Sequence, residues 1–361
     1  MPKPKKSHRK AKPKHTKSKL KRHTPRHSER KIELYPIRFK EIYKKKIWGG
    51  NSLRKVLGKR GTLPKTGESW EITLHEKDVS IVANGYYKGW PLAKLISHIP
   101  QEIMGNEHYM RFYNNFPLIV KFIDAKERLS LQVHPSDEHA QRYETEGSGK
   151  TETWYVVYAP ENAKVIRGVL PGTTIGEFMK HLQDNTIDEC LNVMSVQEGD
   201  VIFIPPGTIH TAYGGVVLLE VQQNSDITYR LHDWGRTDFN GRQRQLDTEK
   251  ALNVMDFYSM GVSKYKPIRL GGYSYKRKLL LRCEKFVMEL MEFRKRIKEK
   301  ASNDRFHILT IIDGTGVFYY GKDKKRKTTF KRGETYLIPA YIGEYDIATR
   351  GNCTIVCSYV M

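Results

Sequence analysis

Apolar and polar residues alternate along residues 129–135 of this chain, in the stretch LSLQVHP. Side chains point alternately to the two faces of a strand, so the alternation predicts a strand with one apolar and one polar face. The apolar positions are Leu129, Leu131 and Val133, and the polar positions are Ser130, Gln132 and His134. A solvent-facing strand would show the same pattern. A glutamine and a histidine two residues apart, followed by a proline, can also be two metal ligands that point inward.

Short apolar segments punctuated by glycine and proline recur along the chain, as in FPLIVKFIDA, TETWYVVYA, NAKVIRGVL and DVIFIPPGTIH. They predict short strands of a barrel or a sandwich. The opening segment, ELYPIRFKEIYKKKIWGGNSLRKVLGK, predicts a strand, a turn at Gly49–Gly50 and a short helix. Further helices are predicted in WPLAKLISHIPQEIMG, in TTIGEFMKHLQD and in RQLDTEKALNVMDFYS, where Asp247 or Thr248 is the expected cap. From about Ile268 the pattern is again that of strands.

An internal repeat relates EGDVIFIPPGTIH, residues 198–210, to RGETYLIPAYIGE, residues 332–344. Both copies have a glycine turn, a buried strand and a proline-containing turn that delivers the next residue inward. His210 of the first copy aligns with Glu344 of the second. With β-rich flanks on both copies, the repeat suggests two barrels of one type, of which the second lacks the histidine and is expected to hold no metal.

Positive charge is concentrated at the N-terminus. The chain of 361 residues has a net charge of +23, and residues 1–31 hold fourteen Lys or Arg against one acid, Glu29. So few apolar residues cannot offset the entropy of ordering, and this segment is expected to be a disordered tail. Such a tail could bind nucleic acid, an anionic membrane surface or an acidic partner weakly, or it could only aid solubility.

The remaining composition narrows the class of protein. No apolar run approaches the roughly 18 residues of a membrane span, and the N-terminus lacks the apolar centre of a secretory signal. The four cysteines, Cys190, Cys283, Cys353 and Cys357, are scattered. This pattern favours a reduced, cytoplasmic compartment and no membrane association. The sequence specifies no oligomeric state.

Candidate metal ligands come from three separate motifs. SLQVHP supplies Gln132 and His134, GKTETWYVV supplies Glu152, and PPGTIH supplies His210. Two imidazoles, a carboxylate and an amide suit zinc, and also manganese, iron or cobalt. Each residue alone is weak evidence, because a lone histidine or glutamate is usually structural or solvated.

A polar strand face is predicted further along. Six residues share parity in a segment that a regular strand would turn to one side: Glu220, Gln222, Asn224, Asp226, Thr228 and Arg230. The neighbouring apolar run VVLLEV would pack in the core, so the polar face reads as the wall of a cavity. The alternative is an exposed strand face.

The motifs SLQVHP, GKTETWYVV, PPGTIHTAYGG and LLEVQQNSDITYRLHDWGR resemble those of type I mannose-6-phosphate isomerases of the cupin superfamily, in their short bacterial form. KKIWGGNSL and GESWEIT extend the resemblance, which is strongest over residues 47–236. It implies a mainly β fold of two cupin-type jelly-roll barrels with a few connecting helices. The expected organisation is a tail at 1–31, a catalytic metal-binding domain at 32–245 with a helical insertion, a connecting helix at 246–267 and a metal-free domain at 268–361.

The resemblance also implies an active site. One catalytic zinc per chain would be held by Gln132, His134, Glu152 and His210, and by position Lys121, Lys150, Glu220 and Arg230 match active-site residues of the family. Aldose–ketose isomerisation moves a proton between carbons 1 and 2 of an open-chain sugar through an enediol, which requires a base and an electrophile. Glu220, Asp226 and Lys150 are candidate bases. Lys121, Lys150 and Arg230 are the cations suited to a sugar phosphate, and Arg offers a two-pronged contact.

Two other functions use the same motifs. A non-catalytic cupin could bind a sugar phosphate as a sensor, tethered to nucleic acid by the basic tail. A metal-dependent oxygenase is the third alternative, because cupins also hold iron. The complete set of matched site residues counts against the sensor, and the phosphate-suited cations count against the oxygenase.

Overall fold

The computed structural model describes residues 1–4, 32–76, 78–113, 115–145, 147–258 and 264–361. Glu33–Met361 form one compact unit. The predicted disorder of the basic tail concerns residues that, apart from 1–4, lie outside this described set. In the part of the chain described, no helix is long and apolar enough to cross a membrane.

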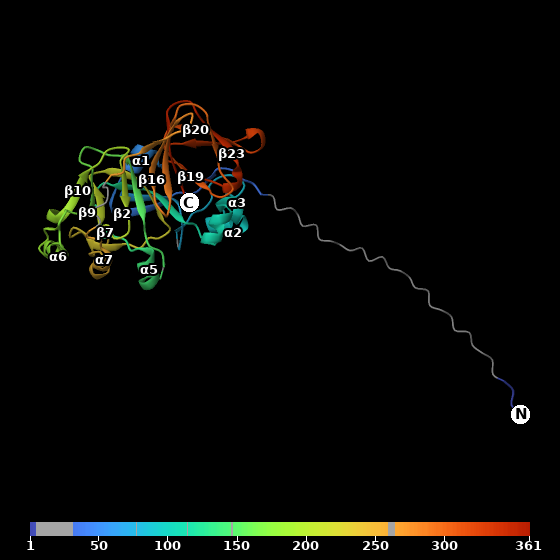
Figure 1. Ribbon diagram of the computed structural model, residues 1–361, viewed down its shortest axis with the longest axis horizontal. Helices are drawn as coiled ribbons and strands as arrows, with labels where there is room; N and C mark the ends of the chain where they lie inside the picture. Colours follow the sequence, from blue (N-terminus) through green and yellow to red (C-terminus); the bar gives the residue numbers. More distant parts are fainter. Residues whose placement is uncertain (5–31, 77, 114, 146, 259–263) are drawn as a thin grey trace. The chain divides into compact units, whose positions relative to one another are not determined.

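Two facing antiparallel sheets form the first sandwich (Figure 1). The six-stranded sheet has the order β11 (Val201–Ile204), β8 (Glu152–Tyr158), β13 (Val216–Gln223), β6 (Leu118–Ala125), β3 (Thr66–Ile72), β2 (Ile42–Gly50). The five-stranded sheet has the order β10 (Leu191–Ser195), β9 (Lys164–Val169), β12 (His210–Tyr213), β7 (Leu131–Val133), β14 (Tyr229–His232).

A second pair of sheets comes mainly from the C-terminal part. The seven-stranded sheet has the order β1 (Ile37–Arg38), β22 (Thr335–Ile338), β19 (His307–Asp313), β24 (Cys353–Tyr359), β17 (Val287–Phe293), β16 (Lys276–Arg282), β15 (Ile268–Leu270). The four-stranded sheet has the order β18 (Ile297–Lys300), β23 (Glu344–Thr349), β20 (Thr315–Tyr320), β21 (Arg326–Lys331). Two short strands, β4 (Leu74–His75) and β5 (Asp78–Val79), pair separately.

The two sandwiches repeat one strand order. The series β11-β8-β13-β6-β3 corresponds to β22-β19-β24-β17-β16, and β10-β9-β12-β7 corresponds to β21-β20-β23-β18. The sequence repeat falls on this correspondence, since Gly199 and Gly333 precede β11 and β22 with φ of 88° and 81°. His210 and Glu344 begin β12 and β23. The mainly β, cupin-type fold is thus confirmed. Among the described residues no ladder closes either pair of sheets into a barrel, so both units are open sandwiches.

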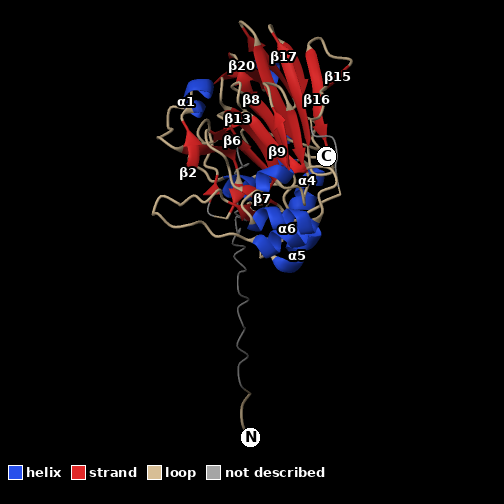
Figure 2. Cartoon of the chain, turned by 90° about the vertical axis from the view of Figure 1, so that its left-hand side faces the viewer, coloured by secondary structure: helices blue, strands red, loops and turns tan. Residues whose placement is uncertain are grey.

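Short helices connect the strands, and Figure 2 draws them in blue, with α1 lying apart from α5 and α6. Their bounds are α1 Ser52–Leu57, α2 Leu92–His98, α3 Pro100–Met104, α4 Asn106–Phe112, α5 Asp137–Tyr143, α6 Ile175–Gln183 and α7 Thr248–Val254. Three 3₁₀ turns are η1 Ile187–Cys190, η2 Lys322–Lys324 and η3 Ala340–Ile342.

Two local predictions need correction, and a third holds for the position of the residue alone. The helical pattern after residue 90 breaks into α2 and α3, because Pro100 cannot continue the first helix. Gly49 and Gly50 close β2 instead of forming the turn, and a Cβ on Gly49 would lie 2.5 Å from the Gly67 backbone nitrogen. Asp247 takes the N-cap position of α7, as predicted, but its carboxylate accepts from the Arg230 backbone N–H at 3.2 Å and makes no capping hydrogen bond.

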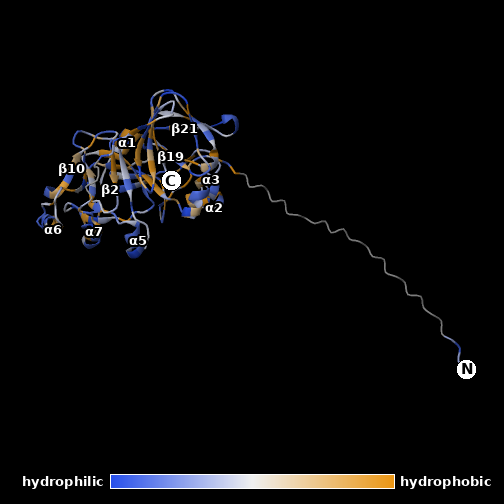
Figure 3. Ribbon diagram, in the orientation of Figure 1, coloured by the Kyte–Doolittle hydropathy of each residue, from blue (hydrophilic) through white to orange (hydrophobic). Residues whose placement is uncertain are grey.

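Apolar side chains of the strands form the buried core clusters. Figure 3 shows hydrophobic residues in orange along the strands. One cluster contains residues of both sandwiches, including Phe122, Tyr155, Leu290 and Phe306. A second cluster, which includes Trp48, Trp154 and Ile202, packs inside the first sandwich. Burying one large apolar side chain stabilises a fold by roughly 1.5–3 kcal/mol. This core holds rigid the strands from which the polar site residues project.

Candidate active site

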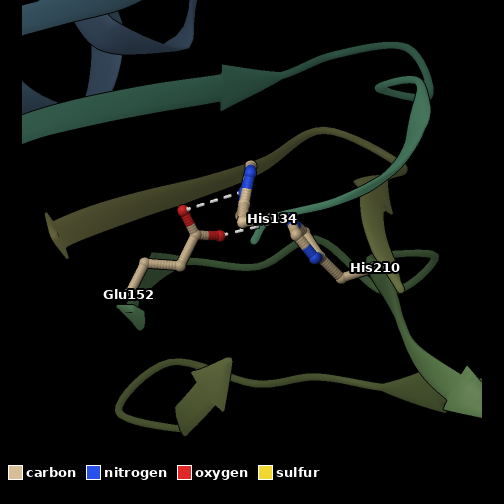
Figure 4. A group of neighbouring side chains, drawn as sticks. All are labelled: His134, Glu152 and His210. Carbon is tan, nitrogen blue, oxygen red and sulfur yellow. Dashed lines mark ion pairs between the residues drawn. The ribbon is translucent and has the colours of Figure 1, made fainter. Parts of the chain in front are cut away.

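Three strands, β7, β8 and β12, bring the two histidines and the glutamate together. His134 follows β7, Glu152 opens β8 and His210 opens β12; all three side chains are buried. Their ligand atoms lie within 4.8 Å of one another. Figure 4 shows both imidazoles turned toward the Glu152 carboxylate. His210 Nε2 is 3.2 Å from Glu152 Oε1 and His134 Nε2 is 3.5 Å from Oε2.

Backbone carbonyls orient the two imidazoles. His134 Nδ1 lies 2.8 Å from the Ile227 carbonyl oxygen, and His210 Nδ1 lies 2.9 Å from that of Thr208. An N–H donated at Nδ1 leaves a lone pair on Nε2, the atom that faces Glu152. Burial, reinforced by the charge of Lys150, lowers the pKa of His134 to about 3, so this ring is neutral. A neutral imidazole fixed through its other nitrogen is the usual state of a metal-binding histidine.

The buried side chain of Glu152 is ionised. Burial by itself would raise the pKa of Glu152, but Lys150 and the two histidines hold that pKa well below its usual range. Glu152 Oε1 is buried and has no hydrogen-bond partner among the described residues. A buried carboxylate oxygen without a donor is costly. The Nε2 atoms of the two histidines and this oxygen therefore fit a divalent cation.

Gln132 adds a fourth donor. It pairs with His210 across β7 and β12, and its amide nitrogen lies 3.1 Å from His210 Nε2. An amide binds a cation through its oxygen, so the Gln132 side chain needs to turn its amide over to complete the set. The four predicted ligands thus lie together, with the amide in a non-ligating orientation.

Lys150 bridges this group to the neighbouring cavity. Its ammonium lies 2.5 Å from Glu152 Oε2 and 3.1 Å from His134 Nε2. Glu220 Oε1 is 3.7 Å away. Lys150 is itself buried, so it places a positive charge where the carboxylates of two strands converge.

A cavity of about 280 Å³ opens beside the group. Its lining includes six of the nine predicted site residues: Lys121, Gln132, Lys150, Glu220, Asp226 and Arg230. The described lining holds five cationic side chains and three carboxylates, a formal excess of two positive charges. This balance suits a dianionic ligand.

Lys121 and Glu220 form the inner wall. They are cross-strand partners on β6 and β13, with 2.9 Å between Lys121 Nζ and Glu220 Oε1. Burial alone would lower the pKa of Lys121, but the carboxylates of Glu220 and Glu68 outweigh it and raise that pKa. Trp154 donates its indole N–H to Glu220 Oε2 at 2.6 Å. The Glu220 carboxylate is therefore held in one orientation.

Two arginines line the outer part of the cavity. Arg230, on β14, donates from Nη1 to the Gln245 carbonyl at 2.8 Å, and its buried Nε has no partner among the described residues. Arg244 donates from Nε to Asp233 at 2.7 Å. Burial and then the charge of Arg244, which lines the same cavity, lower the pKa of Arg230.

The predicted six-residue polar strand is wrong in one respect. β13 ends at Gln223 and β14 begins at Tyr229, so no regular strand runs through the segment. Four of the six residues, Glu220, Asp226, Thr228 and Arg230, still line the cavity. The amide nitrogen of Asn224 donates to the Leu74 carbonyl at 2.9 Å, and the Gln222 amide bonds back onto the break in the strand.

Sequence reasoning missed three charged lining residues, Lys46, Glu68 and Arg244. Lys46 and Glu68 form an ion pair at 3.0 Å. Burial opposes the ionisation of Glu68, but Lys46 and then Lys121 lower its pKa to about 2. Glu68 stands in the motif GESWEIT, which could have singled it out. Lys46, in a run of lysines, and Arg244, in a loop, carry no periodic signal.

Comparison with known proteins gives matches over both sandwiches. Residues 37–164 match the family described as phosphomannose isomerase type I, catalytic domain, and residues 276–360 match the mannose-6-phosphate isomerase cupin domain. Mannose-6-phosphate isomerase ManA of Bacillus subtilis is 32% identical over 322 residues, 89% of this chain and 98% of that protein. The mannose-6-phosphate isomerase of Streptococcus mutans is 40% identical over 220 residues, 61% of this chain and 67% of that protein. A crystal structure of the Bacillus subtilis enzyme superposes with a TM-score of 0.80 at 32% identity, covering 90% of this chain and 99% of that one.

Proposed function

The chain belongs to the family of type I mannose-6-phosphate isomerases, and from this premise we propose that it interconverts mannose-6-phosphate and fructose-6-phosphate with a divalent metal, by way of an enediol. The observation that carries the proposal is that two features of the site adjoin each other. A buried His134–Glu152–His210 group adjoins a cavity whose described lining has an excess of positive charge. Neither feature alone would specify this reaction.

The metal proposed is zinc, one per chain, held by His134, Glu152, His210 and the oxygen of Gln132. Mixed nitrogen and oxygen ligands suit zinc, although other divalent metals bind such sets. When bound, the metal would act as a Lewis acid that stabilises negative charge on the sugar oxygens. The carbonyl partners of both histidines support their role as ligands.

The phosphate of the substrate is proposed to lie against the arginines. Arg230 and Arg244 come from β14 and the loop after it, and both line the cavity. A guanidinium group matches two phosphate oxygens at once. Asp233 accepts from both Nε and Nη2 of Arg244, which fixes the guanidinium group and leaves its Nη1 for a ligand.

Proton transfer between carbons 1 and 2 is assigned to the inner wall. Glu220 Oε1 is buried and makes no hydrogen bond among the described residues, although Lys121 is within ion-pair distance. Lys150 lies between this oxygen and the metal-binding group. We propose that Glu220 and Lys150 carry the proton, and that Asp226, farther out in the lining, orients the sugar hydroxyls.

The direct test is conversion of fructose-6-phosphate by the purified protein with and without a chelator. Activity that the chelator removes and a divalent metal restores would support a metal-dependent isomerase. Binding of the sugar phosphate without conversion would favour the sensor, and oxygen consumption would favour an oxygenase. Conversion that is indifferent to thorough metal removal would contradict the proposed role of the metal.

Deletion of residues 1–31 is expected to leave turnover of the sugar phosphate nearly unchanged, because the cavity residues all lie after residue 45. The same deletion is expected to weaken binding to heparin or nucleic acid, because fourteen Lys or Arg are removed with one acid. That affinity should fall steeply with salt in the full-length protein, as counterion release requires. A large loss of isomerase activity in the shortened protein would instead give the tail a role in the site.

A further inference from the structure

The second sandwich contains its own cavity, of about 440 Å³. It lies at β18, the edge strand of the four-stranded sheet, and reaches the first residue of β19. Its described lining includes Lys300, Ser302, Arg305, His307 and Glu344. None of these residues belongs to the site described above.

Strand registers show that this cavity corresponds to the metal-binding site of the first sandwich. Gln132 pairs with His210 across β7 and β12, and Lys300 pairs with Glu344 across the corresponding β18 and β23. His134 lies two residues after Gln132, and Ser302 lies two residues after Lys300.

The equivalent of Glu152 follows from the strand pairing in the other sheet of each sandwich. Glu152 pairs with Ile204 across β8 and β11, and His307 pairs with Ile338 across β19 and β22. Ile204 and Ile338 are also equivalent in the sequence repeat. The positions of Gln132, His134, Glu152 and His210 are therefore taken by Lys300, Ser302, His307 and Glu344, and all four of these line the second cavity.

The substituted residues do not suit a metal. A lysine replaces the amide and a serine replaces a histidine, so a cationic side chain stands where the first sandwich offers an oxygen donor. Burial, with a smaller effect of Arg305, lowers the pKa of His307 to about 3, so its ring adds no charge. His307 Nδ1 lies 3.3 Å from the Tyr345 hydroxyl oxygen.

The acidic groups around the cavity are already engaged. Glu299 accepts from Arg277 at 2.9 Å, and Arg277 also donates to Glu289 at 2.5 Å. Glu344, at the rim, lies 3.9 Å from Lys324. In the described part of the chain no ion pair is formed by Lys298, Lys300 or Arg305, so their three positive charges remain available.

Arg305 is held ready for a ligand. Its guanidinium lies over the ring of Tyr359, 4.4 Å from the centroid, and its backbone N–H donates to the Ser302 carbonyl at 3.1 Å. Its Nε is buried without a hydrogen-bond partner among the described residues. A planar donor that is fixed by stacking and has an unused N–H is well suited to an oxyanion.

We propose that the cavity of the second sandwich is a separate binding site for a small oxyanion, a phosphate group either free or carried by a small metabolite. Arg305 supplies a fixed guanidinium and Lys298 and Lys300 supply charge. The site is equivalent in position to the proposed metal site of the first sandwich. Lysine and arginine side chains supply the positive charge that a metal ion would supply there. This inference does not depend on the reaction proposed for the first sandwich.

Hydrogen exchange of the full-length protein tests the site, because it reports on residues 297–307 separately from the first cavity. Inorganic phosphate is expected to slow exchange in this segment. Arg305→Gln is expected to weaken that response at least roughly tenfold in phosphate concentration, as loss of a hydrogen bond to a charged group implies. Arg350→Gln, at an exposed arginine of the same sandwich, is the matched control and should respond as the original protein does.

Additional ligands and variants in the same experiment identify the source of the phosphate and check the fold. Protection by fructose-6-phosphate but not by inorganic phosphate would assign a phosphorylated metabolite, and fructose alone should have no effect. An unchanged circular dichroism spectrum of Arg305→Gln shows that the variant is folded, and Arg305→Lys should retain part of the response. The proposal is overturned if neither phosphate compound protects residues 297–307, or if protection persists undiminished in Arg305→Gln.

Discussion

Replacing His134 or His210 by alanine is expected to remove bound metal and isomerase activity together while the chain stays folded. Each imidazole presents Nε2 to Glu152 and is held by a backbone carbonyl at Nδ1, the arrangement expected of a metal ligand. Lewis-acid stabilisation is worth several kcal/mol, and at about 1.4 kcal/mol per tenfold its loss lowers kcat/KM roughly a thousandfold or more.

Metal content per chain, measured after purification in excess zinc, is the primary readout for these variants, and circular dichroism reports the fold. His181→Ala is the matched control, because His181 lies on α6 and does not line the cavity. Unchanged metal stoichiometry in both His134→Ala and His210→Ala would remove the two histidines from the metal site. Lost metal with retained activity would separate metal binding from catalysis.

Arg230→Lys is expected to lower isomerase activity by roughly a hundredfold or more, a loss on the order of 2–4 kcal/mol by analogy with removal of an oxyanion donor. The structure supplies the reason. Arg230 Nη1 is anchored to the Gln245 carbonyl, which leaves the rest of the guanidinium directed to the cavity. A lysine keeps the charge but loses the planar, two-pronged contact.

The kinetic constants then separate two roles for Arg230. A phosphate contact made equally in the ground and transition states raises KM, whereas stabilisation of the enediolate lowers kcat with little change in KM. Metal content should not change, because arginine is not a ligand. Arg242→Lys is the control, since Arg242 is exposed in the same loop as Arg244. If Arg230→Lys keeps the kcat and KM of the unsubstituted protein, Arg230 has no role in the site. Lys150 and Arg244 would then be its main cations.

The sequence by itself determined the fold class and the repeat. Strand periodicity and the glycine and proline turns are local properties, so buried strands such as β6 and β8 were predictable from their own residues. The repeat was readable for the same reason, because Gly199 and Gly333 need the same positive φ before equivalent strands. The motifs of the four predicted ligands were also visible, since His134, Glu152 and His210 stand at strand ends and Gln132 lies two residues before His134.

The tertiary structure decided how these residues combine. Gln132 and His210 are 78 positions apart, and only the register of β7 against β12 brings them to 3.1 Å. The break between β13 and β14 was not predictable, because parity assumes a regular strand and local side-chain hydrogen bonds ended it. The charges of Lys46 and Arg244 are indistinguishable in sequence from solvated ones. Whether such a side chain faces water or a cavity depends on the strands packed against it, and those strands come from distant parts of the chain.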